Sequence, residues 1–255
     1  MSAAGREVLV HPDKDALARA TAERLIARLA DAQDTRGTAS VVLTGGRNGN
    51  ALLGALASSG DRDRIDWSRL DVWWGDERFL PEGDPERNHT QAREALLDSV
   101  PLDPARIHVM PPSDGPYAGD AEAAAEAYAT ELAAAAGGNP AKVPAFDVLL
   151  LGVGPDTHVA SLFPEHPALR ETERTVVGVH AAPKPPPTRL TLTLPAIRAA
   201  EEVWLLAAGD DKADAVALAL SGPGELQAPA AAVRGRSRTL WLLDHTAASR
   251  LPATD

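Results

Sequence analysis

The stretch from Phe146 to Pro164 limits most strongly how this chain can fold. Its first half, up to Leu151, is an almost continuous apolar run that only Asp147 interrupts. Helical patterns lie on both sides of this run, and a short apolar run in that setting is typical of a strand buried on both faces of a sheet. The second half begins at Gly152 and has the composition of a turn. The sequence therefore predicts a central strand of an α/β sheet with a turn at its carboxyl end.

This turn has the pattern Gly-x-Gly-x-Asp-x-His, formed by Gly152, Gly154, Asp156 and His158. Glycine lets a backbone approach a ligand closely, and open α/β sheets bind ligands at the carboxyl ends of their strands. Two glycines after a strand are equally typical of a plain tight turn, and a lone histidine is often a surface residue. The aspartate and histidine, two residues apart and ahead of an expected helix start, favour a site in which histidine acts as a general base.

Composition and charge exclude several classes of function. The 255 residues suffice for one large α/β domain, and we expect residues 1–255 to form it. There is no cysteine, which excludes disulfides, thiolate nucleophiles and cysteine metal sites. A net charge of −11 without a basic stripe disfavours nucleic acids and acidic membranes as partners, but a few converging cations can still bind a small anion.

The same composition gives an expectation about location and assembly. No stretch approaches membrane-spanning length, and charges at Arg6 and Glu7 precede any possible signal core. We therefore expect a cytoplasmic protein, present as a monomer or a small homo-oligomer.

A glycine-rich segment follows another expected strand, Ser40 to Leu43. It reads Thr44-Gly45-Gly46-Arg47-Asn48-Gly49 and leads into a helix expected from about Asn50 to Ala57. A strand, a glycine-rich turn and a helix N-terminus together form an anion site, because free backbone N–H groups and the helix dipole point at the ligand. The spacing fits neither nucleotide-binding glycine pattern, and a plain glycine turn explains the segment equally well.

The rest of the chain predicts further helices and strands. We expect one helix after Asp13, two more at Asn88 to Val100 and Ala121 to Ala136, and another that follows a turn at Gly209 and ends at Leu220. The expected strands are Glu7 to Val10, Leu70 to Trp74, Ile107 to Val109, Thr175 to Val179, Leu190 to Leu194, Val203 to Ala207 and Thr239 to Leu243. After Pro167 the pattern changes from alternating helix and strand to strand after strand. This predicts a mostly parallel central sheet with a β-rich C-terminal part.

The turn around His158 resembles the segment Gly-x-Gly-x-Asp-Gly-His-x-Ala-Ser-Leu-Phe-Pro of 6-phosphogluconolactonases, which share a superfamily with glucosamine-6-phosphate deaminases. Thr157 stands where that family has glycine. If the position needs a positive φ, the loop here differs slightly or is strained. The resemblance implies a three-layer α/β/α fold of the modified Rossmann-like type.

Four more segments extend the resemblance over nearly the whole chain. Gly45 and Gly46 match the family loop that cradles the sugar phosphate, although Arg47 to Gly49 differ. Asp76-Glu77-Arg78 with Pro81 and Asn88 matches a second motif, in which Arg87 replaces the usual serine. Lys184 to Pro195 matches Lys-Pro-Pro-Pro-x-Arg-x-Thr-Leu-Thr-Leu-Pro throughout. Lys212 lies in the first turn of a helix, where the helix dipole disfavours a cation. This position suggests that Lys212 meets a bound phosphate, although a lysine that faces solvent explains it equally well without the resemblance.

The resemblance implies hydrolysis of 6-phospho-D-glucono-1,5-lactone to 6-phosphogluconate in the pentose phosphate pathway, without a metal or organic cofactor. It implies that His158, oriented by Asp156, takes a proton from the water that attacks the lactone carbonyl. It further implies that Arg78 and the N–H groups of Gly45 and Gly46 bind the substrate or the oxyanion. Asp76 and Glu77 would shape the pocket. The phosphate would be bound by Lys184, Arg189 and Lys212 with Arg47.

Other classes fit the sequence less well. A serine esterase using Ser161 lacks the Gly-x-Ser-x-Gly elbow, and a metallohydrolase using His158, Glu165 and His166 lacks the helical spacing and a third ligand. No dinucleotide fingerprint supports redox chemistry. The serious rival is an aldosamine-6-phosphate isomerase or deaminase, which lacks the Asp-Glu-Arg and Lys-Pro-Pro-Pro-x-Arg motifs. A non-catalytic sugar-phosphate sensor is a further alternative, against which the intact histidine argues.

Overall fold

Two sheets organise the chain in the computed structural model, which describes residues 5–139 and 142–252. The larger sheet has six strands in the order β1-β9-β8-β5-β2-β3, and each neighbouring pair is parallel. The strands are β1 (Gly5–His11), β2 (Ala39–Leu43), β3 (Leu70–Trp74), β5 (Val148–Gly152), β8 (Glu202–Ala207) and β9 (Arg238–Asp244). The predicted central strand is confirmed, because β5 lies between β2 and β8.

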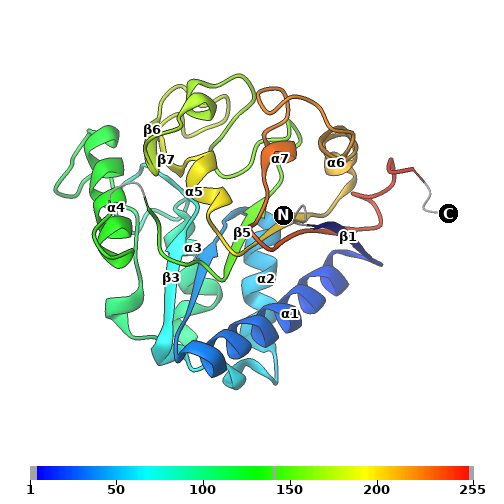
Figure 1. Cartoon of the computed structure of the whole chain (residues 1–255), viewed down its shortest axis with the longest axis horizontal. Coiled ribbons are helices and arrows are strands. Elements are labelled where there is room, and N and C mark those ends of the chain that lie inside the picture. Colours follow the sequence, from blue (N-terminus) through cyan, green and yellow to red (C-terminus); the bar gives the residue numbers. More distant parts are fainter. Residues whose placement is uncertain (1–4, 140–141, 253–255) are drawn as a thin grey trace.

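Side chains that alternate along these strands enter two different cores, one on each face of the sheet. Val148 and Leu150 pack with the helices of the first face, α1 (Lys14–Arg36), α2 (Gly46–Ser58) and α3 (Asn88–Ala95). Leu149 and Leu151 pack on the second face with α4 (Ala121–Ala135), α5 (Leu194–Arg198), α6 (Ala213–Leu220) and α7 (Pro229–Ala232). The continuous apolar run is thus explained by burial on both faces, and Figure 1 shows α1 and α2 together on one side of the sheet.

The second face also holds a small antiparallel sheet with the order β4-β7-β6, made by β4 (Asp76–Arg78), β7 (Arg189–Leu192) and β6 (Val176–Val179). The layered α/β architecture and the β-rich C-terminal part are therefore confirmed. However, only β8 and β9 of that part join the main sheet. The charged triplet at the start of this small sheet is a strand with buried Asp76 and Glu77, and not a solvated loop.

Four sequence-based expectations about local structure were wrong. Ile107 to Val109 is not a strand, because Ile107 makes only an isolated bridge to Val72. The helix α2 begins at Gly46, four residues earlier than expected, so Arg47 lies in its first turn. The helix α3 ends at Ala95 and is followed by a short 3₁₀ turn. No helix begins directly after His158; residues 159–162 form a turn closed by a bridge.

The buried carboxylate of Asp147 fixes the approach to β5. It accepts a hydrogen bond from the Ser40 backbone N–H and contacts the guanidinium groups of Arg28 and Arg36 from α1. A buried charge is tolerated when it is paired and hydrogen-bonded in this way. The one polar residue in the apolar run therefore ties β5 to β2 and to α1.

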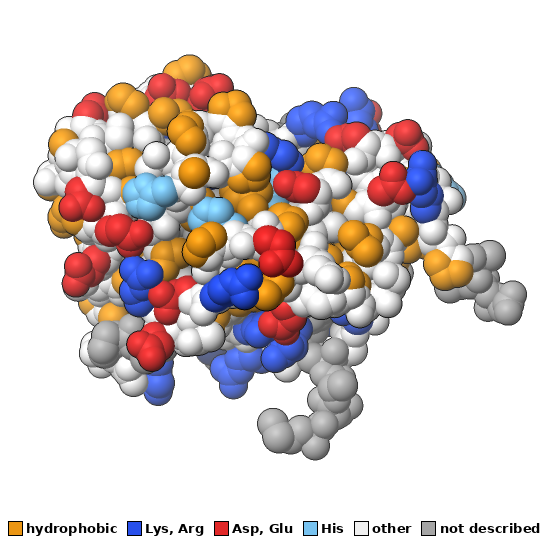
Figure 2. Space-filling model, turned by 90° about the horizontal axis from the view of Figure 1, so that it is seen from above, with side chains coloured by type: hydrophobic (Ala, Val, Ile, Leu, Met, Phe, Trp, Pro, Cys, Tyr) orange, Lys and Arg blue, Asp and Glu red, His pale blue; other side chains and the backbone are white. Residues whose placement is uncertain are grey.

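The outer surface carries charges of both signs in mixed groups. On the face drawn in Figure 2, blue and red side chains lie beside one another. Arg174, for example, pairs with both Glu122 and Glu171. Among the described residues, no helix is long and apolar enough to cross a membrane.

The edge strand β3 is covered by a tyrosine from α4. The Trp74 backbone N–H donates a hydrogen bond to Tyr128 Oη over 3.0 Å, and this hydroxyl lies 3.2 Å from the carbonyl oxygen of His108, to which it donates. Tyr128 is fully buried. Its hydroxyl thus satisfies backbone groups that have no partner strand on this side.

We expect Tyr128→Phe to lower the free energy of unfolding by about 1–3 kcal/mol, because it leaves a buried backbone N–H without an acceptor. Chemical denaturation measures this change. The other tyrosine, Tyr117, is partly buried against the same core, and Tyr117→Phe serves as the control with an expected change below about 0.5 kcal/mol. Equal effects of the two substitutions would contradict the proposed role of the Tyr128 hydroxyl.

Candidate active site

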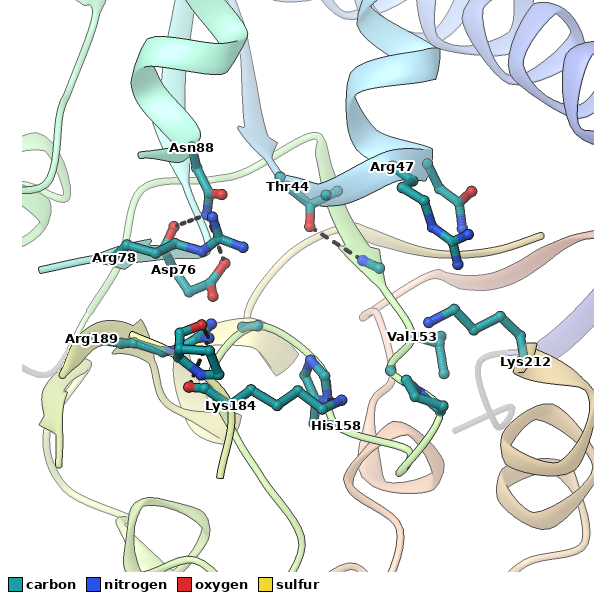
Figure 3. Close-up of a pocket in the computed structure, with 18 residues that line it drawn as sticks. Thr44, Arg47, Asp76, Arg78, Asn88, Val153, His158, Lys184, Arg189 and Lys212 are labelled. Atoms are coloured by element: carbon teal, nitrogen blue, oxygen red, sulfur yellow. Dashed lines mark hydrogen bonds between the residues drawn. The ribbon is translucent and has the colours of Figure 1, made fainter. Parts of the chain in front are cut away.

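A pocket with a volume of about 290 Å³ lies where β2, β3, β5 and β8 end. The parallel strands bring their carboxyl ends to one edge, as open α/β sheets do at their ligand sites. Figure 3 shows the side chains that point into this pocket. Residues from these loops and from the small sheet line it: Thr44, Gly45, Gly46, Arg47, Asn48, Asp76, Arg78, Asn88, Gly152, Val153, Gly154, Pro155, His158, Ala160, Lys184, Pro185, Arg189 and Lys212.

A histidine and an aspartate form a close pair after β5. His158 Nδ1 lies 2.5 Å from Asp156 Oδ1, and the ring packs on Phe163 with 4.6 Å between ring centroids. A Cβ at Gly154 would lie 2.0 Å from His158 Nδ1, so the pair needs a glycine at this position. Burial opposes ionisation of Asp156, but hydrogen bonds and charges from His158 and Lys184 hold the pKa of this carboxyl well below its usual range.

Lys184 joins this pair from the proline-rich segment. Its Nζ lies 3.1 Å from Asp156 Oδ1 and 3.4 Å from His158 Nδ1. The backbone around it is held by Arg189, whose guanidinium donates hydrogen bonds to the carbonyl oxygens of Lys184, Pro185 and Pro186. The Lys184 ammonium therefore shares one aspartate oxygen with the imidazole ring.

Two arginines lie on neighbouring strands of the small sheet. Arg78 of β4 and Arg189 of β7 are register partners, and Arg78 donates to the carbonyl oxygen of Glu86. Arg189 is 5% exposed, and its pKa is lowered by burial and by Arg78, while Asp76 acts in the opposite direction. Two guanidinium groups bound to carbonyl oxygens form an anion site.

Asp76 connects this arginine pair to the histidine loop. Its Oδ2 accepts a 2.7 Å hydrogen bond from the Ser161 hydroxyl, and its backbone oxygen accepts one of 2.9 Å from Asn88 Nδ2. Asn88 in turn packs against Gly45, where a Cβ would lie 1.9 Å from the amide oxygen. Ser161 is fully buried, which makes it a structural link and a poor nucleophile.

A second cationic group lies at the start of α2. Gly45 is the N-cap of this 13-residue helix and gives it no side-chain cap. Arg47 pairs with Asp211 over 2.8 Å, and Lys212 Nζ lies 3.7 Å from the same carboxyl. Burial lowers the pKa of Lys212, as do Arg47 and Lys184, while Asp211 raises it. Free helix N–H groups beside two cations favour an anion.

Known proteins of one family resemble this chain in sequence and in fold. Residues 12–241 match the family described as glucosamine-6-phosphate isomerases/6-phosphogluconolactonase. The chain belongs to this family. It is 74% identical to 6-phosphogluconolactonase of Streptomyces coelicolor over 247 residues, covering 96% of this chain and 95% of the relative. It is 52% identical to 6-phosphogluconolactonase of Mycobacterium tuberculosis over 245 residues, covering 96% and 98%. The solved 6-phosphogluconolactonase of Trypanosoma cruzi superposes with a TM-score of 0.83 at 26% identity, covering 98% of both chains.

The structure gathers the residues that the sequence singled out, but it divides the cations. Gly45, Gly46, Arg47, Asp76, Arg78, His158, Lys184, Arg189 and Lys212 line the pocket, and Asp156 contacts two of them. The expected phosphate ligands line one pocket but have different nearest partners. Arg189 lies with Arg78, Lys212 lies with Arg47, and Lys184 lies against Asp156. No group of three possible metal-ligating side chains occurs within residues 5–139 and 142–252.

Glu77 does not line the pocket and lies beneath it. It accepts hydrogen bonds from the backbone N–H groups of Arg78, Asn88 and His89, and the guanidinium of Arg87 lies 3.9 Å away. Burial raises the pKa of the Glu77 carboxyl to about 7, while Arg87 and the three N–H groups oppose this rise. Arg87, which replaces the usual family serine, is thus a buried partner of Glu77. Sequence reasoning missed this pairing, for which the spacing of ten residues between Glu77 and Arg87 was the signal. It placed Asn88 in a family motif but not in the pocket.

Thr157 occupies a strained position in the histidine loop. Its φ is +70°, its side chain is 2% exposed, and its hydroxyl has no hydrogen-bond partner. A residue with a Cβ is disfavoured in this left-handed region, where glycine is not. The glycine-to-threonine difference from the family therefore stores strain beside His158.

We expect Thr157→Gly to be more stable than Thr157→Ala by about 1 kcal/mol, because both lack the threonine side chain and only glycine relieves the positive φ. Thermal unfolding of the two variants measures the difference. Thr193, buried at a φ of −83°, provides the control: there the alanine variant should be the more stable by about 0.4–1 kcal/mol. The same order at both positions would argue against strain at Thr157.

Proposed function

We propose that the chain hydrolyses 6-phospho-D-glucono-1,5-lactone to 6-phosphogluconate, in the oxidative pentose phosphate pathway. The observation that carries this proposal is the Asp156–His158 pair, set in a pocket between two cationic groups. A general base next to anion sites suits a substrate with a phosphate at one end and an electrophilic carbon at the other. Close relatives in the same family are named 6-phosphogluconolactonase, which supports the same reaction.

In the proposed mechanism His158 is the general base. Its Nδ1–H donates to Asp156, which leaves the lone pair of Nε2 free to accept a proton. Nε2 removes a proton from water while the water oxygen attacks C1 of the lactone, giving a tetrahedral oxyanion and an imidazolium. The C1–ring oxygen bond then breaks, and the ring oxygen takes the proton from the imidazolium. The products are the carboxylic acid, which ionises, and a neutral imidazole ready for another cycle.

The arginine pair is suited to the end of the substrate where charge develops. Arg78 and Arg189 contact backbone carbonyl oxygens in the free protein. Asp76 beside them accepts a hydrogen bond from buried Ser161, so its position is fixed from behind. We assign Arg78, assisted by Arg189, to the lactone carbonyl and its oxyanion.

The start of α2 is suited to the phosphate. The uncapped N-terminus supplies N–H groups at Gly46 and Arg47, and Lys212 faces it from the start of α6. A dianionic phosphate there would replace Asp211 as the partner of both cations. We therefore assign Gly45, Gly46, Arg47 and Lys212 to the phosphate, at the opposite side of His158 from the arginine pair.

We further propose that residues 1–255 act as one domain in the cytoplasm. The pocket draws on segments from Thr44 to Lys212 and on both sheets. Cysteine-free composition provides no disulfide that would favour an oxidising compartment.

The first test is lactone hydrolysis with and without His158. The lactone is generated in place by a dehydrogenase, and ring opening is compared with the spontaneous rate. We expect strong acceleration by the wild-type protein and a kcat lower by a factor of about 100 or more in His158→Ala. His180→Ala, an exposed histidine outside this pocket, is the control and should retain full activity. Ammonia release from glucosamine 6-phosphate without lactone hydrolysis would instead indicate a deaminase.

The phosphate assignment is tested by comparing two lactones. We expect Lys212→Met to raise KM for the phosphorylated lactone about tenfold or more, because a charge-assisted contact is lost. Hydrolysis of unphosphorylated D-glucono-1,5-lactone should stay within about twofold of wild type. Lys142→Met, an exposed lysine outside the pocket, is the control. If Arg189→Met rather than Lys212→Met removes the preference for the phosphorylated lactone, the phosphate lies at the arginine pair.

A further inference from the structure

Lys184 has a contact that phosphate binding does not explain. Its ammonium group lies beside both members of the Asp156–His158 pair and shares Asp156 Oδ1 with the ring. The nearest ring atom, Nδ1, is 3.4 Å away and is the atom that contacts Asp156, so Nε2 is the ring nitrogen left for a substrate. Lys184 is therefore placed to act on the free enzyme before any substrate binds.

The position of Lys184 is built into the fold. Three consecutive carbonyl oxygens, those of Lys184, Pro185 and Pro186, accept hydrogen bonds from the single guanidinium of Arg189. Arg189 is itself buried and sits over the Phe163 ring, 5.5 Å from its centroid, and the same ring supports His158. One buried arginine thus fixes the lysine backbone relative to the histidine.

The charges determine what this position does. An aspartate that contacts only a histidine favours the imidazolium, because the two then form an ion pair. An imidazolium cannot accept a proton from water and is useless as the base. A lysine on the same oxygen already pairs the carboxylate, and it places a second positive charge next to Nδ1. Both effects disfavour protonation of the ring, although the 38% exposure of the Lys184 side chain moderates them.

We propose that Lys184 is a positioning residue for His158: its ammonium group forms an ion pair with Asp156 Oδ1 and thereby keeps the imidazole neutral and able to accept a proton. The inference rests on the proposed function only in naming His158 as the base. The other charged groups of the pocket are Asp76 and Arg78 from β4, Arg189 from β7, Arg47 from α2 and Lys212 before α6. None of these side chains is removed when Lys184 alone is replaced.

The decisive variant is Lys184→Met, which keeps the length of the side chain and removes its charge. Without Lys184, the His158–Asp156 ion pair forms more readily, so protonation of the ring persists to higher pH. We expect the acid limb of the kcat/KM profile to move up by about one pH unit. At a pH one unit below the midpoint of the wild-type acid limb, the kcat/KM of the variant is then roughly tenfold lower than that of the wild type. The kcat at the alkaline plateau stays within about threefold of the wild-type value. Lys184→Arg keeps the charge and should restore the wild-type limb.

A second measurement does not depend on activity. The imidazole nitrogen resonances of His158, identified by their loss in His158→Gln, are titrated by NMR in the free protein. We expect the midpoint to move to higher pH in Lys184→Met and to stay near wild type in Lys184→Arg. Lys184→Gln provides a second neutral variant, and circular dichroism verifies that each variant is folded.

The outcomes separate the inference from the proposed function. An unmoved midpoint and an unmoved acid limb in both neutral variants would overturn the inference. A raised KM with an unmoved profile would show that Lys184 binds substrate phosphate instead, which also overturns it. A moved NMR midpoint in a protein without lactonase activity would support the Lys184 role while rejecting the proposed reaction.

Discussion

The parallel alignment of β5 between β2 and β8 is the constraint on which the site depends. Strands that run in one direction deliver their carboxyl ends to one edge, so the loops after Leu43, Gly152 and Ala207 meet there. Burial of β5 on both faces fixes its register, because a shift by one residue would exchange Leu149 and Leu150 between two separate cores. The position of the glycine turn that follows β5 is therefore fixed. The His158 ring can then pack so closely against Gly154 that there is no room for a Cβ at that residue.

The small sheet adds what the parallel sheet cannot supply by itself. Antiparallel pairing of β4 with β7 places Arg78 opposite Arg189, two residues 111 positions apart. Like charges directly opposite one another are unfavourable in a sheet, and here each guanidinium is stabilised by carbonyl oxygens. The buried Glu77–Arg87 pair holds the start of α3 against the same strand. These contacts hold two cations side by side, an arrangement that is suited to binding an anion.

Local patterns predicted much of this fold from the sequence. Asp13 caps α1 as expected, with its carboxylate accepting from the N–H groups of Asp15 and Ala16, and the apolar run forms the central strand. Expectations were wrong where tertiary contacts outweighed local pattern. The segment after Arg106 reads as a strand, yet its neighbour β3 is covered by the Tyr128 hydroxyl, and only one bridge forms. The helix α2 begins inside the glycine-rich stretch, at Gly46, which has a positive φ that glycine tolerates.

The sequence indicated which residues lie at the site better than it indicated which of them contact one another. Each of them lies directly after a strand or in a motif, so the sequence could place them at one edge of the sheet. Which cation lies next to which carboxylate depends on nonlocal geometry: the register of β4 against β7, and the path of the segment from Lys184 to Arg189. The sequence pattern therefore grouped Lys184, Arg189 and Lys212 as one phosphate site, whereas the structure gives them three different sets of neighbours.

The charge distribution explains how an acidic protein can bind an anion. The net charge of −11 acts at long range and is screened by salt, whereas the pocket cations act at contact distance. Hydrolysis of a lactone adds one negative charge to the ligand at the carbon that was attacked. In the proposed arrangement that carbon lies near His158 and faces the Arg78–Arg189 pair, which stabilises the oxyanion and then the new carboxylate. The phosphate keeps its cations at the other side, so both charged ends of the ligand face cations although the protein as a whole is acidic.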